Sequence, residues 1–273
     1  MTVEAFAPAK INLTLHVTGQ RDDGYHLLDS LVVFADIGDR IWLSPGDALS
    51  LDVSGEFAEG VPTDDRNLVW QAADGVGWTG RVHLEKTLPH GAGIGGGSSD
   101  TATVLKSLAA QGFPTADGFP LSLGADVPVC MSAQASRMQG IGEKITPVAL
   151  PKLPALLVNP GVQVPTGTVF SSMETRDNPP MPSIIPDFST PQDCTNWLSE
   201  QRNDLQTSAI GAAPQIKQVL SALDSTKDVQ LTRMSGSGAT CFALYPTVKA
   251  AHFAASEIAD GYPDWWCVAT ELS

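Results

Sequence analysis

The sequence predicts an α+β protein built in two halves. Segments with strand-like and helix-like patterns are mixed along the 273 residues without regular alternation of strand and helix, which is typical of α+β folds. Two prolines in "LPKLP", Pro151 and Pro154, mark a seam in the chain. We therefore expect an N-terminal domain over residues 1–152 and a C-terminal domain over residues 153–273.

The first half is rich in strand-like alternation. Residues 5–18 predict a strand, with alternation of apolar and polar side chains from Ile11 to Val17; residues 27–44 predict one or two more strands, and residues 81–89 alternate again. The first two are separated by the turn-rich "GQRDDGYH", and a turn is expected at Gly38-Asp39 within the second. Residues 98–111 predict a helix that Gly112 ends, with an apolar face made of Thr101, Val104, Leu105 and Leu108.

The second half is predicted to contain strands, one helix and one long loop. Just before the seam, a hairpin with a Gly-x-Gly turn is expected at residues 137–148; after the seam, a Pro-rich exposed loop is expected at residues 174–193. Further strands are predicted at residues 155–160, 228–234, 240–245 and 265–272, with a helix at 248–259.

Composition narrows the class of protein. The net charge of −14 argues against nucleic acid and anionic membranes as partners, and no apolar run is long enough to span a bilayer. The four cysteines are scattered, which favours a reducing cytoplasm over disulfides or zinc. The N-terminal "MTVEAFAPAK" has no pattern of a secretory signal. An anionic ligand must therefore be bound by groups close to it, because the net negative charge of the protein repels it.

The glycine-rich "LPHGAGIGGGSSD" at residues 88–100 fits the common phosphate motifs badly. Read as a dinucleotide fingerprint, it needs an acid about 20 residues further on at the end of a strand, and Asp117 lies instead in the turn-rich "GFPTADGFP". Read as a Walker loop, it has Gly97 where the lysine belongs. The sequence also lacks the H-R-D and D-F-G motifs of protein kinases.

The loop nevertheless has the ingredients of an anion site. Glycines permit positive φ, so backbone N–H groups can close around a phosphate, and the free N–H groups of the following helix favour negative charge. Ser98 or Ser99 is expected to cap this helix, or to place a hydroxyl on phosphate or a metal ion. The lysine must then come from elsewhere, and Lys10 in "APAKINL" is the best candidate; a solvated lysine at the end of a strand is the alternative.

Three segments together resemble the GHMP kinases. "PHGAGIGGGSS" resembles their second motif, and "SGSGATCFALY" at residues 235–245 resembles their third, in which Gly236 and Gly238 would let a turn approach the phosphates. Residues 7–30 are similar to the first motif of the branch that acts on 4-diphosphocytidyl-2-C-methyl-D-erythritol in the route to isoprenoids. "LGADVP" and "PGVQVPT" also match that branch, so the resemblance covers nearly the whole chain.

The resemblance implies a fold, a reaction and a cofactor. The fold would be the two-domain GHMP kinase fold, with an N-terminal domain like the second domain of ribosomal protein S5 and a ferredoxin-like C-terminal domain. The reaction would be ATP-dependent phosphorylation of a hydroxyl, with Mg²⁺; the sequence singles out no metal ligands. The ATP phosphates would be cradled by Pro89, Gly91, Ala92, Gly93, Ile94, Gly95, Gly96, Gly97, Ser98 and Ser99.

Other residues would serve the acceptor. Asp126 in "LGADVP" is the expected base for the acceptor hydroxyl, with a helix cap as the alternative role. Lys10 would lie near it and steer the hydroxyl, and Asn12 would hydrogen-bond the acceptor. By the resemblance, Tyr25 stacks on the cytidyl ring and His26 hydrogen-bonds it. Thr166 is a weaker candidate for the substrate site, since it also suits a helix start.

Some features depart from the family pattern, and some questions stay open. His90, Ala92 and Asp100 stand where Met, Gly, and Asn or Ala are usual; an acid at Asp100 would repel phosphate if it pointed inward, and would favour the helix dipole if it pointed out. Another GHMP kinase of the homoserine or mevalonate type, or an inactive nucleotide sensor, are the alternatives. The partners expected are ATP and a small cytidyl substrate, for a monomer or homodimer.

Overall fold

The computed structural model describes residues 1–273 and divides into two compact units that interleave along the chain. Unit 1 comprises Met1–Lys10, Ile37–His90 and Gly95–Ala133; unit 2 comprises Ile11–Asp36, Gly91–Ile94 and Gln134–Ser273. Two strands, β1 (Val3–Asn12) and β3 (His26–Pro45), each contribute to both units. The domain boundary near residue 152 stays a prediction.

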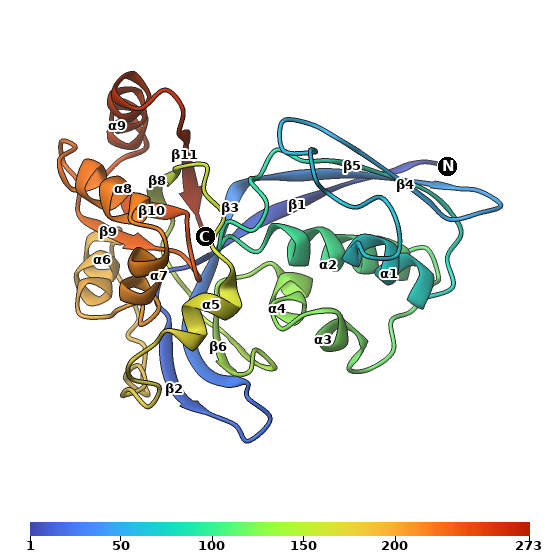
Figure 1. Cartoon of the computed structure of the whole chain (residues 1–273), viewed down its shortest axis with the longest axis horizontal. Helices are drawn as coiled ribbons and strands as arrows, with labels where there is room; N and C mark the ends of the chain where they lie inside the picture. Colours follow the sequence, from blue (N-terminus) through green and yellow to red (C-terminus); the bar gives the residue numbers. More distant parts are fainter. The chain divides into compact units, whose positions relative to one another are not determined.

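Unit 1 is a sheet with its helices on one side (Figure 1). The last residues of β3 pair antiparallel with β5 (Gly80–Glu85), and β4 (Ser50–Ser54) runs parallel to β5. The interior side chains of β5 alternate with exposed ones, as expected for a strand with one face on the core. The helices are α1 (Leu68–Gly75), α2 (Gly96–Ala109), α3 (Phe119–Leu123) and α4 (Val127–Ser132).

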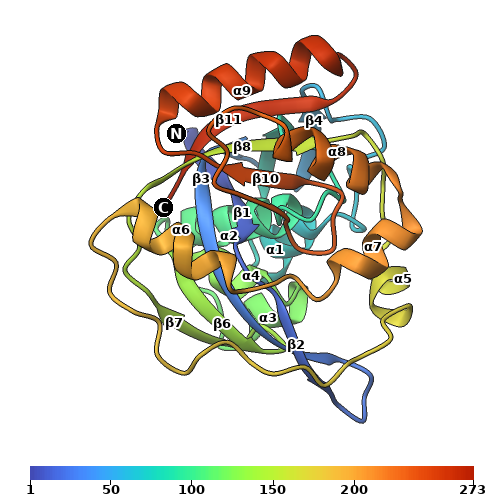
Figure 2. The same cartoon turned by 90° about the vertical axis from the view of Figure 1, so that its left-hand side faces the viewer.

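Unit 2 contains an antiparallel sheet in the order β11–β8–β10–β9. Its strands are β8 (Leu153–Asn159), β9 (Leu231–Met234), β10 (Cys241–Leu244) and β11 (Trp266–Leu272). Helices α8 (Gln215–Asp224) and α9 (Val248–Gly261) pack on this sheet, and Figure 2 shows α9 lying along β11. Every residue of β8 is buried, which agrees with its apolar sequence from Leu153 to Val158.

A second group of strands in unit 2 surrounds the first part of β3. The strand β2 (His16–Gln20) forms a hairpin with β3, and β6 (Ser136–Gly140) pairs with both β3 and β7 (Lys144–Pro147). The β6–β7 hairpin confirms the one predicted at residues 137–148. The remaining helices are α5 (Thr166–Ser171), α6 (Pro191–Ser199) and α7 (Gln206–Ala212).

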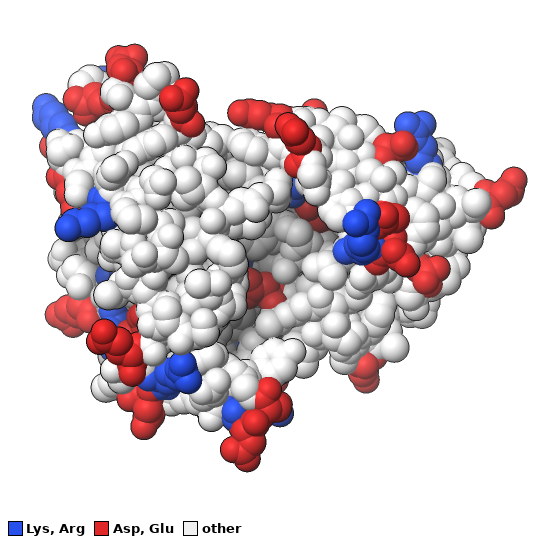
Figure 3. Space-filling view, viewed as in Figure 1, with Lys and Arg blue, Asp and Glu red and all other residues white.

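Acidic and basic side chains are interspersed on the face shown in Figure 3, where acidic groups are the more frequent. This distribution agrees with the excess of 30 acidic over 16 basic residues in the sequence. None of the helices is long and apolar enough to cross a membrane.

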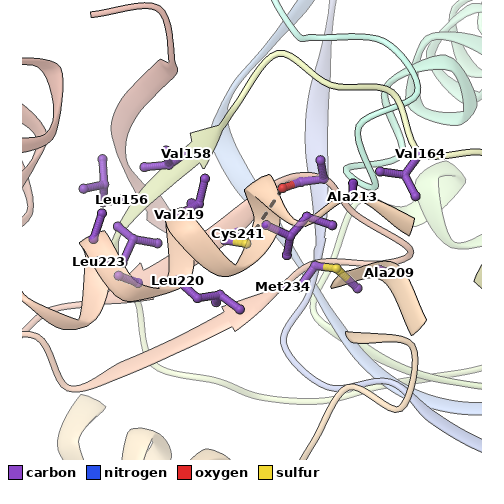
Figure 4. Packing of buried hydrophobic residues seen from close by; sticks show 14 of the residues in the cluster. Leu156, Val158, Val164, Ala209, Ala213, Val219, Leu220, Leu223, Met234 and Cys241 are labelled. Carbon is purple, nitrogen blue, oxygen red and sulfur yellow. Dashed lines mark hydrogen bonds between the residues drawn. The ribbon is translucent and has the colours of Figure 1, made fainter. Parts of the chain in front are cut away.

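The main hydrophobic cluster of unit 2 lies between α8 and the β8–β10 sheet (Figure 4). In α8, the side chains of Ile216, Val219, Leu220 and Leu223 recur at positions i, i+3, i+4 and i+7 and are all buried. They pack with side chains of the sheet such as Leu156 and Val158. The mixture of helices and strands confirms the predicted α+β class.

Two predictions about strands were wrong. The segment 5–18 is not one strand: it is interrupted after Asn12, because the backbone N–H of Leu15 bonds the carbonyl of Arg202 rather than continuing the ladder. Gly38-Asp39 is not a turn but lies within the continuous β3. A Cβ at Gly38 would lie 2.1 Å from the carbonyl oxygen of Ala7, so the glycine permits close approach of β1.

The other predicted elements are present with shifted ends. The helix predicted at 98–111 is α2, and the helix at 248–259 is α9. The predicted loop at 174–193 is largely exposed, but its last residues begin α6 and Met181 is buried. The sequence patterns did not predict strand β4 or the helices α1, α3, α6, α7 and α8, and the starts of α4 and α5 were expected only as alternative roles of Asp126 and Thr166.

Candidate active site

A buried lysine and a half-buried aspartate form an ion pair in unit 1. Lys10 Nζ lies 2.8 Å from Asp126 Oδ2, with side-chain exposures of 3% and 33%. Lys10 comes near the end of β1, and Asp126 precedes α4. The sequence predicted both residues and their proximity, although they are separated by 116 positions.

The alternative roles considered for these two residues do not fit. A solvated strand-end lysine would be exposed, whereas the Lys10 side chain is almost fully buried. Asp126 does occupy the N-cap position of α4, but its side chain makes no capping hydrogen bond and bonds Lys10 instead. A buried ammonium with one partly exposed carboxylate leaves that carboxylate free to meet a ligand proton.

The glycine loop enters α2 in unit 1 through a residue with positive φ. Gly95 is the N-cap of α2 with φ of 63°, and a Cβ there would lie 3.0 Å from the Cβ of Lys10. Neither Ser98 nor Ser99 caps the helix, contrary to one of the two roles expected, because α2 begins at Gly96. The N–H groups of the first turn, from Gly96 to Ser98, have no partners within the helix and carry its positive dipole end.

The earlier part of the loop packs against the third glycine-rich motif in unit 2. The Ser235 hydroxyl donates to the carbonyl of Gly93 at 2.9 Å, and the N–H of Thr240 donates to the carbonyl of Ala92 at 3.1 Å. A Cβ on Gly93 would lie 2.5 Å from the carbonyl oxygen of Ser235. A Cβ on Gly236, which has φ of 54°, would lie 2.7 Å from the carbonyl oxygen of Gly93. The two motifs recognised in the sequence therefore contact each other through glycine backbone.

Asn12 is buried in unit 2 beside the same serine. Its backbone N–H donates to Ser235 Oγ at 3.0 Å, and its side-chain Nδ2 donates to Ser30 Oγ at 2.8 Å. Ser30 in turn donates to the carbonyl of Thr14. The amide nitrogen of Asn12 is thus held within the protein, and its predicted contact with an acceptor stays a prediction.

The "DGYH" segment forms the turn between β2 and β3 in unit 2. Tyr25 is 59% exposed, and His26 is partly buried at the start of β3. The His26 ring stacks on Phe170 of α5, with centroids 4.6 Å apart and planes 27° apart. Burial lowers the pKa of His26, and Arg176 lowers it further. Phe170 was not predicted as a site residue; its only signal in the sequence is a lone aromatic side chain in "PTGTVF".

Thr166 is the first residue of α5, and its side chain does not cap that helix. Its hydroxyl lies 2.8 Å from Ser237 Oγ of the third motif. Thr166 itself is exposed, so it connects the start of α5 to the glycine-rich turn while remaining accessible.

A second buried lysine was missed entirely. Lys86, at the end of β5, is ion-paired with Asp39 of β3 and lies 2.8 Å from Asp100 Oδ2 of α2. All three side chains are at most 3% exposed. Asp100 therefore neither points into solvent, as the helix-dipole role required, nor lies in the first turn of α2.

No group of three or more His, Cys, Asp or Glu side chains is arranged to hold a metal ion.

Comparison with known proteins agrees with these features. The sequence model of the GHMP kinases N terminal domain matches residues 67–133, and that of the GHMP kinases C terminal matches residues 186–264. A relative from Dinoroseobacter shibae, named 4-diphosphocytidyl-2-C-methyl-D-erythritol kinase, is 58% identical over 99% of this chain and 95% of its own. The chain belongs to the GHMP kinase family.

This GHMP kinase also has close structural relatives. A crystal structure of 4-(cytidine 5'-diphospho)-2C-methyl-D-erythritol kinase is 32% identical, covers 99% of both chains and superposes with a TM-score of 0.78. A second relative of that name, from Cereibacter sphaeroides, is 51% identical over 96% of both chains. A homoserine kinase from Cytophaga hutchinsonii is 16% identical with a TM-score of 0.64, which indicates a shared fold. The chain is therefore an ATP-dependent small-molecule kinase with the GHMP kinase fold.

Proposed function

We propose that this kinase transfers the γ-phosphoryl group of ATP to a hydroxyl of 4-diphosphocytidyl-2-C-methyl-D-erythritol, the 2-hydroxyl by family resemblance. The observation that carries the proposal is the 58% identity, over almost the whole chain, to a relative named for this activity. Homoserine kinase shares only the fold, at 16% identity, so it offers much weaker support for the homoserine alternative. The retained pair of Lys10 and Asp126 argues against an inactive sensor.

Asp126 is the proposed proton acceptor. The acceptor hydroxyl gives its proton to the carboxylate while its oxygen forms a bond to the γ-phosphorus. The bond from that phosphorus to the β–γ bridging oxygen breaks, and ADP leaves. Lys10, which holds one carboxylate oxygen at 2.8 Å, fixes the direction of Asp126 and carries positive charge next to the reaction.

The backbone from Pro89 to Ser99 is proposed to bind the ATP phosphates. The positive φ of Gly93 and Gly95 and the free N–H groups at the start of α2 support this role. A protein-only metal cage is absent, which fits an ion that arrives with the nucleotide, since Mg²⁺ keeps water ligands and binds through phosphates. Bound Mg²⁺ would neutralise charge on those phosphates.

The cytidyl end is proposed to bind at Tyr25 and His26. A neutral imidazole can both donate and accept a hydrogen bond, and the lowered pKa of His26 favours that form. Phe170, already stacked on His26, adds an aromatic surface for a pyrimidine. Asn12 and Thr166 are proposed to orient the acceptor and its diphosphate.

The test is ADP release coupled to oxidation of NADH, measured with five acceptors. These are the cytidyl substrate, its uridyl analogue, homoserine, mevalonate and galactose. We expect turnover of the cytidyl substrate, poor turnover of the uridyl analogue and essentially none of the rest, because a mispaired polar group in the base site costs binding energy. Robust turnover of homoserine or mevalonate would leave only the family assignment, and no turnover of any acceptor would favour the sensor.

A further inference from the structure

The buried cluster of Lys86, Asp39 and Asp100 joins both ends of the glycine loop within unit 1. At the entrance, Asp39 Oδ1 accepts hydrogen bonds from the backbone N–H groups of Thr87 at 2.7 Å and Leu88 at 2.9 Å. At the exit, Lys86 reaches Asp100 on α2. A Cβ on Gly96, the first residue of α2, would lie 3.5 Å from Lys86 Nζ, so the cluster lies directly against the start of that helix.

If all three groups are ionised, the cluster has one carboxylate without a matching positive charge in a site that water does not reach. Two carboxylates and one ammonium sum to −1 if all are ionised, and none of the three is exposed to water. Asp39 receives three donors, from Lys86, Thr87 and Leu88. Asp100 receives one, and its Oδ1 is buried with no hydrogen-bond partner. An ionised carboxylate with an unsatisfied buried oxygen is costly, so the cluster is best neutralised by a proton on Asp100.

The pKa values agree in direction with this assignment. Desolvation raises the pKa of Asp100 to about 7, with Lys86 opposing the rise and Asp39 adding to it. The pKa of Lys86 is also raised, because the two carboxylates outweigh the effect of its burial, so the lysine keeps its charge.

We propose that Asp100 is a positioning residue for nucleotide binding. Through Lys86 and Asp39, it fixes the start of α2 relative to the strand that leads into the glycine loop. The charge state of Asp100 also sets how tightly the loop binds phosphate. The neutral form leaves the positive end of α2 intact for an anion. The ionised form leaves an uncompensated negative charge beside that end and weakens anion binding. The role of the loop as phosphate site rests on the proposed function.

No other group packed around Asp100 accounts for a change of charge with pH beside the start of α2. Helix α1 contributes only the exposed Asp74. From α4 comes Cys130, whose thiol pKa is raised by burial and which is therefore uncharged at neutral pH. The other charged residues around Cys130 are Lys10 and Asp126, which are paired with each other, and Lys106 on α2 itself.

The experiment measures binding of the β,γ-imido analogue of ATP by calorimetry from pH 6 to 8.5, without acceptor. The variants are Asp100→Asn, which keeps the shape and an oxygen for Lys86, and Asp100→Ala, which removes the link. Between pH 6 and 8.5 the wild-type Kd should rise by about fivefold more than that of Asp100→Asn, as one unit charge a few ångströms away implies. Titration of the analogue's own phosphates affects both proteins equally, so the ratio of the two Kd values isolates Asp100.

The alanine variant tests positioning separately from charge. Asp100→Ala should raise the Kd of the analogue by about tenfold or more at every pH, which corresponds to the loss of one hydrogen bond to a charged group. The KM for the cytidyl acceptor should stay within about twofold of the wild-type value. Asp100→Asn should restore analogue affinity. A constant ratio of wild-type to Asp100→Asn Kd across pH, or equal losses for nucleotide and acceptor in Asp100→Ala, would overturn the proposal. Because the binding arm contains no acceptor, an incorrect acceptor assignment does not alter its result.

Discussion

Lys10 and Lys86 are both 3% exposed, yet their partners give them different roles. Lys10 pairs with Asp126, a third of which is exposed and can meet a ligand. Lys86 pairs with two carboxylates that no ligand can reach without rearrangement. Exposure of the partner, and not of the lysine, thus separates the residue expected to act on substrate from the residue expected to support the loop.

Replacing the members of the first pair should abolish turnover with little effect on ATP binding. Asp126→Asn removes a proton acceptor needed in the transition state, so kcat should fall by about 10²–10⁴-fold. Lys10→Ala should have a similar effect. The matched control is Asp64→Asn, which removes an exposed ion pair with Arg66 in the same unit and should leave kcat unchanged. Near-normal kcat in a folded Asp126→Asn variant would show that the base lies elsewhere.

His26 should make binding of the cytidyl substrate sensitive to acid. The pKa of His26 is lowered from the ordinary 6.5, so the ring is mostly neutral at pH 7 and becomes mostly protonated only below pH 6.5. The protonated ring can no longer accept a hydrogen bond. The KM for the cytidyl substrate should therefore rise once the pH falls below the ordinary 6.5 of a histidine, while His26→Ala should have a high and nearly constant KM. Steady-state kinetics from pH 5 to 8, with saturating ATP, measure this; parallel pH profiles for both proteins would contradict it.

At the scale of single residues, motifs located the Lys10–Asp126 ion pair but not the buried cluster of Lys86, Asp39 and Asp100. Lys10 and Asp126 each fall in a segment with a recognisable pattern. Asp39, Lys86 and Asp100 acquire their roles only when three elements meet, with partners 47 and 14 positions apart. No local pattern distinguishes such a lysine in "LEKTLP" from a solvated one.

Among the structural elements, the start of α2 is the part expected to hold phosphate. Gly95→Val would place a branched side chain at φ of 63°, against Lys10, where L-residues are strained. ATP affinity should fall by at least about tenfold, since a bulky side chain blocks close backbone approach, whereas affinity for the cytidyl substrate should change much less. Gly112→Val is the control, because Gly112 also has positive φ but lies beyond the other end of the helix. Equal losses for both ligands in a folded protein would indicate a purely structural glycine.

Helix α8 supplies much of the core of unit 2. Leu223→Ala should lower the free energy of unfolding by about 2–5 kcal/mol through lost burial and a cavity. Lys217→Ala on the exposed face of α8 should change it by less than about 0.5 kcal/mol. Denaturant unfolding followed by circular dichroism compares them. A loss below 1 kcal/mol for Leu223→Ala would mean that α8 packs less closely than described.

The elements show why some predictions failed. The apolar pattern of α8 is present in the sequence, but no motif lies beside it and no glycine or capping residue marks its ends. Gly38 was a different kind of error: a glycine in a strand can mark a turn or the close approach of another strand, and only the position of Ala7 distinguishes the two. The interruption of the first strand likewise depends on a partner at Arg202, far along the chain.

At the scale of the whole molecule, the net charge of the protein has the same sign as the charge of its proposed ligands. The chain has a net charge of −14, and its proposed ligands, ATP and a diphosphate-linked acceptor, are both anionic, so the net charge of the protein repels them. The backbone N–H groups at the start of α2 act on a bound phosphate over short distances, where screening by salt is weak. The fold class was predictable from mixed strand and helix patterns together with three motifs spread over the chain. The interleaving of the two units was not, because it arises from two strands that serve both.

The most direct test of the central claim follows the phosphoryl group itself. ATP labelled with ³²P at the γ position is incubated with the protein and the cytidyl substrate, and the products are separated and identified by mass spectrometry. The proposal predicts one labelled phosphate on the methylerythritol part of each acceptor, in an amount equal to the ADP formed, and almost none with Asp126→Asn. Label that stays in ATP, or is released as inorganic phosphate while the cytidyl substrate remains unmodified, would contradict the assignment of this chain as its kinase.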